Sequence, residues 1–136
     1  MQYDDFIGAV QHRAQLDSRE AALSTSRATL TTLSERIDPG QASNLGAQLP
    51  GELGRFLEQV DDVDRFEFEE FVGRVADREE IGEGDPADVA FRAQVVVDVL
   101  EEAVDEGALE DVRRQLPTDE GYEDLFEIAK AEESPG

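Results

Sequence analysis

The chain contains two copies of one sequence pattern, and this repeat limits its fold more than any other feature. Residues 3–10 read Tyr-Asp-Asp-Phe-Ile-Gly-Ala-Val, and residues 68–75 read Phe-Glu-Glu-Phe-Val-Gly-Arg-Val, 65 positions later. Gln-Leu-Pro recurs at residues 48–50 and 115–117, where the offset is 67. Two extra residues therefore fall in the second copy, around residues 82–84. We expect the chain to fold as two copies of one unit.

The spacing of the apolar residues predicts that both copies are helical. Apolar residues recur at intervals of three and four, as at Tyr3, Ile7 and Val10, which favours a helix over a strand. Asp85 followed by Pro86 is typical of a helix N-cap and first turn. The expected helices are residues 4–15, 18–37, 41–48 and 51–59 in the first copy, and residues 67–79, 86–104, 108–115 and 119–130 in the second.

The two long segments differ in polarity. Segment 86–104 carries four apolar residues outside its main stripe: Phe91, Val95, Val96 and Val99. The matching positions of segment 18–37 include Ser24, Thr29 and Thr32. Because a helix that is apolar on most sides is usually buried on most sides, we expect 86–104 to be central and 18–37 to be more peripheral.

The copies are expected to share one core. We expect a first repeat over 1–60, an acidic linker over 61–66, a second repeat over 67–130 and a flexible tail over 131–136. Each repeat has about 60 residues, which is close to the lower limit for independent folding. The sequence therefore predicts an all-α fold of eight helices, with two four-helix repeats packed as one pseudo-twofold bundle.

The charge of the chain is strongly negative. It has 34 Asp and Glu against 12 Lys and Arg, for a net charge of −22. Lys130 is the single lysine, and the apolar stripes argue for a folded core rather than a disordered acidic chain. Such a balance is typical of proteins from salt-accumulating halophiles, above all haloarchaea, because molar salt screens the repulsion. A basic partner or DNA mimicry is the alternative, which the even spread of the acids disfavours.

Several site classes are excluded or disfavoured by residue type. The absence of cysteine excludes disulfides, thiolate zinc sites and a cysteine nucleophile. No apolar run approaches the ~20 residues of a membrane span, and no signal peptide is recognisable, so we expect a cytoplasmic protein. His12, the single histidine, is expected to be exposed and inert. Five serines lack the Gly-x-Ser-x-Gly context of a nucleophile: Ser18, Ser24, Ser26, Ser34 and Ser43.

Charged clusters give no recognisable ligand motif. One acidic cluster comprises Asp61, Asp62, Asp64, Glu67 and Glu69, and another comprises Glu79, Glu80, Glu83 and Asp85. Neither has the Gly and Glu that an EF-hand loop needs at positions 6 and 12. Gly82-Glu83-Gly84 lacks the basic residue of a phosphate loop, and Arg113-Arg114 is the only basic doublet, flanked by acids. We therefore expect no metal, nucleotide or nucleic-acid site.

The remaining repeated residues have structural interpretations. We expect four arginines to pair with acids or to cover apolar surface: Arg13, Arg27, Arg78 and Arg92. Anion binding between the copies is the alternative for them. In each Gln-Leu-Pro, Leu should lie in the core, Pro should open the next helix, and Gln should bond a free backbone group. A recognition surface formed by these two loops is the alternative.

These motifs together point to a family. Two copies of Phe-aliphatic-x-x-Val, Leu-x-x-x-Ile/Val-Asp-x-Gly and Leu/Val-x-x-Gln-Leu-Pro resemble the small helical family catalogued as domain of unknown function 2267. The resemblance covers residues 3–126, with residues 82–84 as a departure in the second copy. It implies an all-helical duplicated domain without an established activity, and it supplies no catalytic or ligand residues.

We therefore expect a non-enzymatic protein-interaction or regulatory module adapted to high salt. The alternative is a small-ligand or anion-binding protein that uses the groove between the repeats. No catalytic, cofactor-binding or metal-binding residue is predicted, and no cofactor. The expected partner is an unidentified protein rather than a nucleic acid or a membrane, and the chain should be a monomer or a homodimer.

Overall fold

The computed structural model describes residues 1–58, 62–80 and 85–126, and these residues form helices and turns without a strand. The α-helices of this part are α1 (Tyr3–Arg13), α2 (Arg19–Arg36), α3 (Pro39–Ala47), α4 (Gly51–Gly54), α5 (Phe68–Arg78), α6 (Pro86–Ala103) and α7 (Glu106–Arg114). Three 3-10 segments complete it: η1 (Arg55–Leu57), η2 (Thr118–Glu120) and η3 (Tyr122–Phe126). The all-α class is confirmed. None of the helices described has the length and apolar character needed to cross a membrane.

The prediction of an eighth helix is wrong. Residues 119–130 were expected to be helical, but the chain forms η2, then Gly121 at φ 89°, then η3. A residue in this left-handed conformation interrupts a right-handed helix, and glycine adopts it without steric penalty. Helix 51–59 is also shorter than expected, because α4 gives way to η1 after Gly54. Residues 59 and 127–130 of these two predictions, and the tail, lie outside the described residues.

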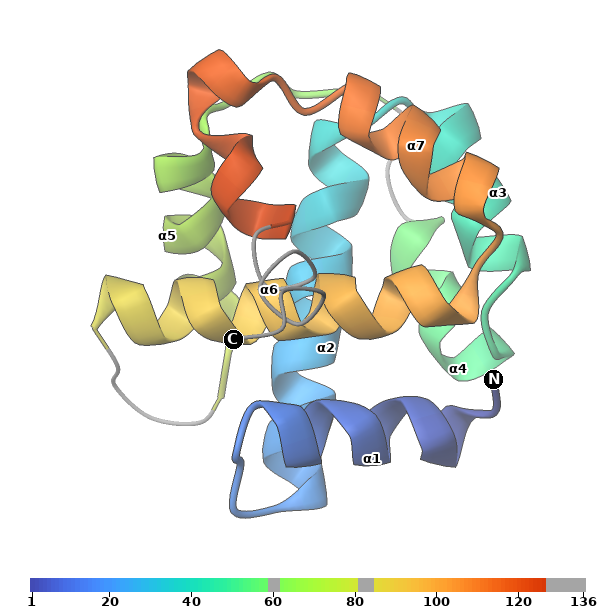
Figure 1. The fold of residues 1–136 in the computed structure, drawn as a ribbon, viewed down its shortest axis with the longest axis vertical. Helices are drawn as coiled ribbons and strands as arrows, with labels where there is room; N and C mark the ends of the chain where they lie inside the picture. The colour runs from blue at the N-terminus through green and yellow to red at the C-terminus, as the bar shows by residue number, and fades with distance from the viewer. Residues whose placement is uncertain (59–61, 81–84, 127–136) are drawn as a thin grey trace, which may run out of the picture.

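Two long helices cross near the middle of the molecule (Figure 1). We call α1 to η1 the first half and α5 to η3 the second half. The first short helix of each half, α1 or α5, packs against both long helices, α2 and α6. Helices α3 and α7 lie against each other at one side of the molecule. The two halves therefore share one core rather than forming separate units.

The expectation that segment 18–37 is peripheral is wrong. Helix α2 buries eleven of its eighteen residues, against eight of eighteen in α6. Its buried set includes Ser26, Thr29 and Thr32, at 0% exposure, whereas Phe91 of α6 is 39% exposed. Small hydroxyl side chains let α1, α5 and α6 approach α2 closely, and helical Ser and Thr can bond the backbone of their own helix.

Aromatic side chains hold η3 against α5. Tyr122 is fully buried, and its ring meets those of Phe68 and Phe71 edge-on at 5.8 and 6.0 Å between centroids. Its hydroxyl donates to the carbonyl of Phe66 at 2.6 Å. Burial raises the pKa of the Tyr122 hydroxyl to about 12, so the group remains a hydrogen-bond donor at neutral pH. This cluster fixes the end of the described chain to the second half.

Candidate functional site

The residues weighed as catalytic candidates are dispersed. His12 is exposed on α1, as expected, and lies in a shallow depression beside Gly8 and Gln11. Ser18 caps α2 by accepting a hydrogen bond from the Ala21 backbone N–H at 3.0 Å. The other four serines lie on α2 and α3, where Ser24, Ser26 and Ser34 are buried and Ser43 is exposed.

Four acids of the two predicted clusters serve as partners of arginines and backbone groups: Asp64, Glu79, Glu80 and Asp85. Within the described ranges, no group of three metal-ligating side chains could hold an ion. Asp85 caps α6, while Asp61 and Glu83 lie outside the described residues. Three acids pair with arginines of other segments: Asp64 with Arg74 at 2.8 Å, Glu79 with Arg92 at 2.9 Å and Glu80 with Arg27 at 3.4 Å.

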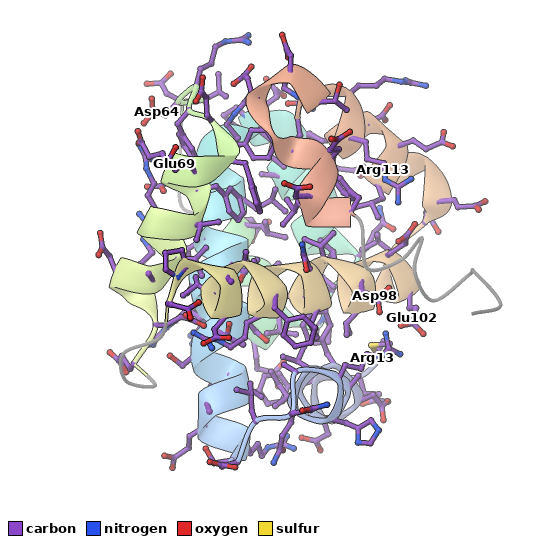
Figure 2. The ribbon with its side chains drawn as sticks, turned by 60° about the vertical axis from the view of Figure 1, so that its left-hand side comes forward. Arg13, Asp64, Glu69, Asp98, Glu102 and Arg113 are labelled. Atoms are coloured by element: carbon purple, nitrogen blue, oxygen red, sulfur yellow. The ribbon has the colours of Figure 1, made fainter. Side chains whose placement is uncertain are left out.

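Arginine bridges join the two halves in a reciprocal way. Arg13 of α1 pairs with Asp98 at 2.8 Å and with Glu102, both on α6, as Figure 2 shows. At the matched position of α5, Arg78 pairs with Glu35 of α2 at 2.6 Å. Each first helix is thus tied to the long helix of the other half. The prediction that Arg13, Arg27, Arg78 and Arg92 pair with acids is confirmed.

These bridges shift the acidity of the carboxylates that they contain. Arg78 donates to both oxygens of Glu35, at 2.6 and 2.7 Å, and this holds the pKa of Glu35 below its usual value. The hydrogen bond from Arg13 lowers the pKa of Glu102 in the same way. Both carboxylates therefore stay ionised to a lower pH than an unpaired glutamate, and their role is to join helices.

The two Gln-Leu-Pro segments also make a reciprocal contact. The side-chain oxygen of Gln48 accepts from the backbone N–H of Asp105 at 2.7 Å, and that of Gln115 accepts from the N–H of Asp38 at 2.6 Å. Each glutamine therefore caps the start of the other half's third helix. The structural interpretation of Gln-Leu-Pro is confirmed, because Leu49 and Leu116 are buried as well.

An apolar groove of about 500 Å³ lies between α5 and the first turns of α6. We call it the α5–α6 groove. Eight of its lining residues are apolar or glycine, and Glu69 is the single charged one. The lining comprises Phe68, Glu69, Val72, Gly73, Ala76, Pro86, Ala87, Val89 and Ala90. Gly73 and Ala76 are exposed and small, which leaves the floor of the groove open.

An arginine covers the matching face of the first half. Arg19 occupies the position of Pro86, and its guanidinium lies 5.7 Å from the ring centroid of Tyr3. It also pairs with Asp4. Pro86 can make neither contact with Phe68, the counterpart of Tyr3. The α5–α6 groove is therefore a feature of the second half. Its surface is left uncovered in part because the second half has Pro86 where the first half has Arg19.

A second cleft lies where the halves meet, and arginines line it. It has a volume of about 270 Å³ and is lined by Arg36, Asp38, Val63, Arg65, Arg114, Gln115 and Pro117. We call it the arginine cleft. The matching positions at the other junction hold Ala47 and Ala103 in place of Arg114 and Arg36. A quarter of the chain's twelve basic residues therefore gather at this one junction.

Sequence reasoning missed both features for the same reason. A repeat predicts the features that its two copies share, whereas the groove and the cleft arise where the copies differ. The sequence indicates these features only through differences at matched positions, such as Arg19 against Pro86 and Ala47 against Arg114.

In its described residues, the fold is an all-helical one in which arginine bridges tie the first helix of each half to the long helix of the other half. Within this class, the chain belongs to the family described as uncharacterized conserved protein, DUF2267, whose model matches residues 3–125. This confirms the family resemblance seen in the sequence motifs. A comparison with curated proteins found no match.

Proposed function

We propose that this protein is a non-enzymatic interaction or regulatory module, built by duplication of one helical unit into a pseudo-twofold bundle. Support for the duplication comes from the lengths of matched helices: 11 residues in α1 and α5, 18 in α2 and α6, and 9 in α3 and α7. The reciprocal glutamine caps and the reciprocal arginine bridges support it further, because a twofold relation exchanges each such contact with its partner.

The observation that carries the interaction function is the α5–α6 groove. This apolar concavity, on a surface this acidic, includes the half-buried Ala90 and the exposed Ala76, and it offers a place where a partner can bury apolar area. Several charged side chains at the helix contacts, such as Glu35, Arg78 and Glu79, are engaged in bridges.

The test is affinity capture from an extract of the native cells, held in molar KCl, with the wild-type chain and two variants as baits. Pro86→Arg restores the covering arginine of the first half, whereas Ala47→Arg adds the same charge at an exposed site away from the groove. A partner recovered by the wild type and Ala47→Arg but lost by Pro86→Arg supports the function. Repeated failure to recover any stable partner, with a monomer in solution, contradicts it.

We further propose that the protein comes from a halophile, with haloarchaea as the best fit, and works in the cytoplasm. The net charge of −22 and the single lysine support the high-salt part of this proposal. Urea unfolding measured at increasing KCl concentration tests the high-salt part.

A second candidate function is anion binding in the arginine cleft. Arg36 is 1% exposed, and its guanidinium donates through Nε to the carbonyl of Phe66 at 3.0 Å and through Nη2 to Glu120 at 3.3 Å. Arg65 and Arg114, which are both exposed, add two further guanidinium groups to the lining of the cleft. Isothermal titration calorimetry with inorganic phosphate at constant ionic strength tests this. The function is supported if the wild type binds phosphate and Arg65→Gln does not. It is contradicted if the wild type gives no detectable heat of binding.

A further inference from the structure

The charges around the α5–α6 groove are of one sign. Glu69 lines the groove, and Asp77 directly follows the lining residue Ala76. Both acids are exposed, and neither has an ion-pair partner within the described part of the chain. Figure 2 shows Glu69 on α5, on the same side of the molecule as Asp64.

The basic residues of the same two helices are already engaged. Arg74 donates to Asp64 and to Glu70, at 2.8 and 2.9 Å. Arg78 of the same helix is held by Glu35 of α2. Arg92, the remaining arginine of α6, donates to both oxygens of Glu79 at 2.9 Å. The field at the groove is therefore negative.

We propose that the α5–α6 groove binds a segment of another protein that inserts large apolar side chains and carries lysine or arginine on either side of them. This inference rests on the proposed interaction function and names the chemistry of its partner. The apolar lining receives side chains such as Leu or Phe, and the rim acids pair with the flanking cations.

The charge of the molecule argues against a second copy of this chain as the occupant. In a dimer, the acids at the rim would meet an equally acidic surface at contact distance, where molar salt screens least. A basic segment instead gains from the rim acids at contact distance, even where molar salt limits the Debye length to ~3 Å. Salt also strengthens the burial of the apolar side chains when it is excluded from the protein surface.

The experiment measures the binding of three fluorescent 15-residue peptides to the full chain by anisotropy, in 2 M KCl. One peptide contains only Leu and Lys in an amphipathic pattern, the second replaces Lys by Glu, and the third replaces Leu by Ser. The wild type should bind the Leu/Lys peptide at least tenfold more tightly than either of the others. Pro86→Arg should weaken this binding at least tenfold, and Ala47→Arg should change it less than twofold. Circular dichroism verifies that both variants fold.

Five results would overturn the proposal. Equal binding by Pro86→Arg and Ala47→Arg would place the peptide elsewhere, and equal binding of the Leu/Glu peptide would remove the need for basic residues. A wild-type dimer that Pro86→Arg dissociates would make a second copy the occupant. A chain ending at Phe126 that binds tenfold more tightly than the full chain would make the chain's own last residues the occupant. If the cell extract yields a partner that Pro86→Arg loses while the Leu/Lys peptide does not bind, the interaction function stands and only the partner chemistry fails.

Discussion

Hydroxyl side chains in the middle of α2 differ in how their polar atoms are satisfied. Thr32 donates from Oγ1 to the carbonyl of Ala28 at 2.8 Å and accepts from Arg78 at 2.9 Å. Three other buried hydroxyls, those of Thr25, Ser26 and Thr29, have no hydrogen-bond partner among the described residues. A buried hydroxyl without a partner destabilises the folded state, because it loses its hydrogen bonds to water. Threonine therefore stabilises the folded state at position 32, where its hydroxyl is hydrogen-bonded, and destabilises it at position 29, about one helical turn away.

Replacing Thr29 by valine should stabilise the protein. The matched residue in α6 is Val96, which is fully buried, so the core of this fold accepts valine there. We expect Thr29→Val to raise the free energy of unfolding by about 1 kcal/mol, since it removes an unsatisfied polar group at nearly constant volume. Thr32→Val is the matched control and should lower it by about 1–3 kcal/mol, because it breaks two hydrogen bonds. Urea denaturation measures both, and a loss of stability in Thr29→Val would contradict the assignment.

Glu35 should contribute to stability in a way that depends on pH. Glu35→Gln should cost about 1.5 kcal/mol at pH 7, since hydrogen bonds to charged groups contribute about 1.5–3 kcal/mol when buried and less when exposed. Because folding lowers the pKa of Glu35, this contribution is present above the unfolded value near 4.5 and is lost as the pH falls through the lower folded value.

Urea midpoints of the wild type and Glu35→Gln should therefore converge as the pH is lowered below about 4.5. Glu102→Gln is the control, and its effect should be smaller because the Glu102 side chain is 50% exposed, against 23% for Glu35. A constant difference between wild type and Glu35→Gln down to acid pH would show that the bridge to Arg78 does not stabilise the fold.

At the scale of elements, α3 and α4 come so close that their backbones touch. A Cβ atom added at Gly46 would lie 2.8 Å from the carbonyl oxygen of Gly54, and one added at Gly54 would lie closer still to the carbonyl oxygen of Gly46. Real Cβ atoms do not approach backbone at such distances, and a backbone cannot turn aside as a flexible side chain can. The two glycines therefore set the distance between these helices.

Alanine at Gly46 should consequently destabilise the protein, although it favours a helix locally. We expect Gly46→Ala to lower the free energy of unfolding by about 2 kcal/mol, through the shift it forces between α3 and α4. Gly8→Ala is the control, because Gly8 lies inside α1 with open space around its Cα, and it should gain about 0.5–1 kcal/mol. Thermal unfolding followed by circular dichroism compares them, and similar melting temperatures would contradict the close contact.

The helices themselves were predictable, but their burial was not. Apolar spacing predicted α1, α2, α5 and α6 within about two residues of their ends, because periodicity and caps such as Asp85 act locally. The central place of α2 could not be predicted by counting apolar residues, since helical Ser and Thr satisfy part of their polarity within their own helix, as Thr32 does. Neither could the α5–α6 groove, which depends on how the residues of two helices, among them Phe68 and Pro86, are placed around one concavity.

At the scale of the whole molecule, the few positive charges are used between helices and the negative charges remain outside. Arg13, Arg78 and Arg92 lie in bridges between segments, while acids such as Glu110 and Asp119 are exposed without an ion-pair partner in the described part of the chain. The unscreened repulsion among such acids opposes folding. At 0.1 M salt the Debye length is about 10 Å, which spans neighbouring surface acids, and at 1 M it is about 3 Å.

Folding should therefore strengthen as KCl rises from 0.1 M to 3 M. We expect the urea midpoint to increase steeply up to about 1 M, where charge screening saturates, and more slowly above it through salting-out of apolar surface. A triple variant, Glu110→Gln, Asp119→Asn and Glu123→Gln, removes three exposed acids and leaves the bridges intact. It should be more stable than the wild type at 0.1 M KCl, with a flatter first phase, and should match it at 3 M. Helical circular dichroism and urea midpoints that do not change across the series would contradict adaptation to high salt. A triple variant with the wild-type slope would assign the salt effect to salting-out rather than to the acidic surface.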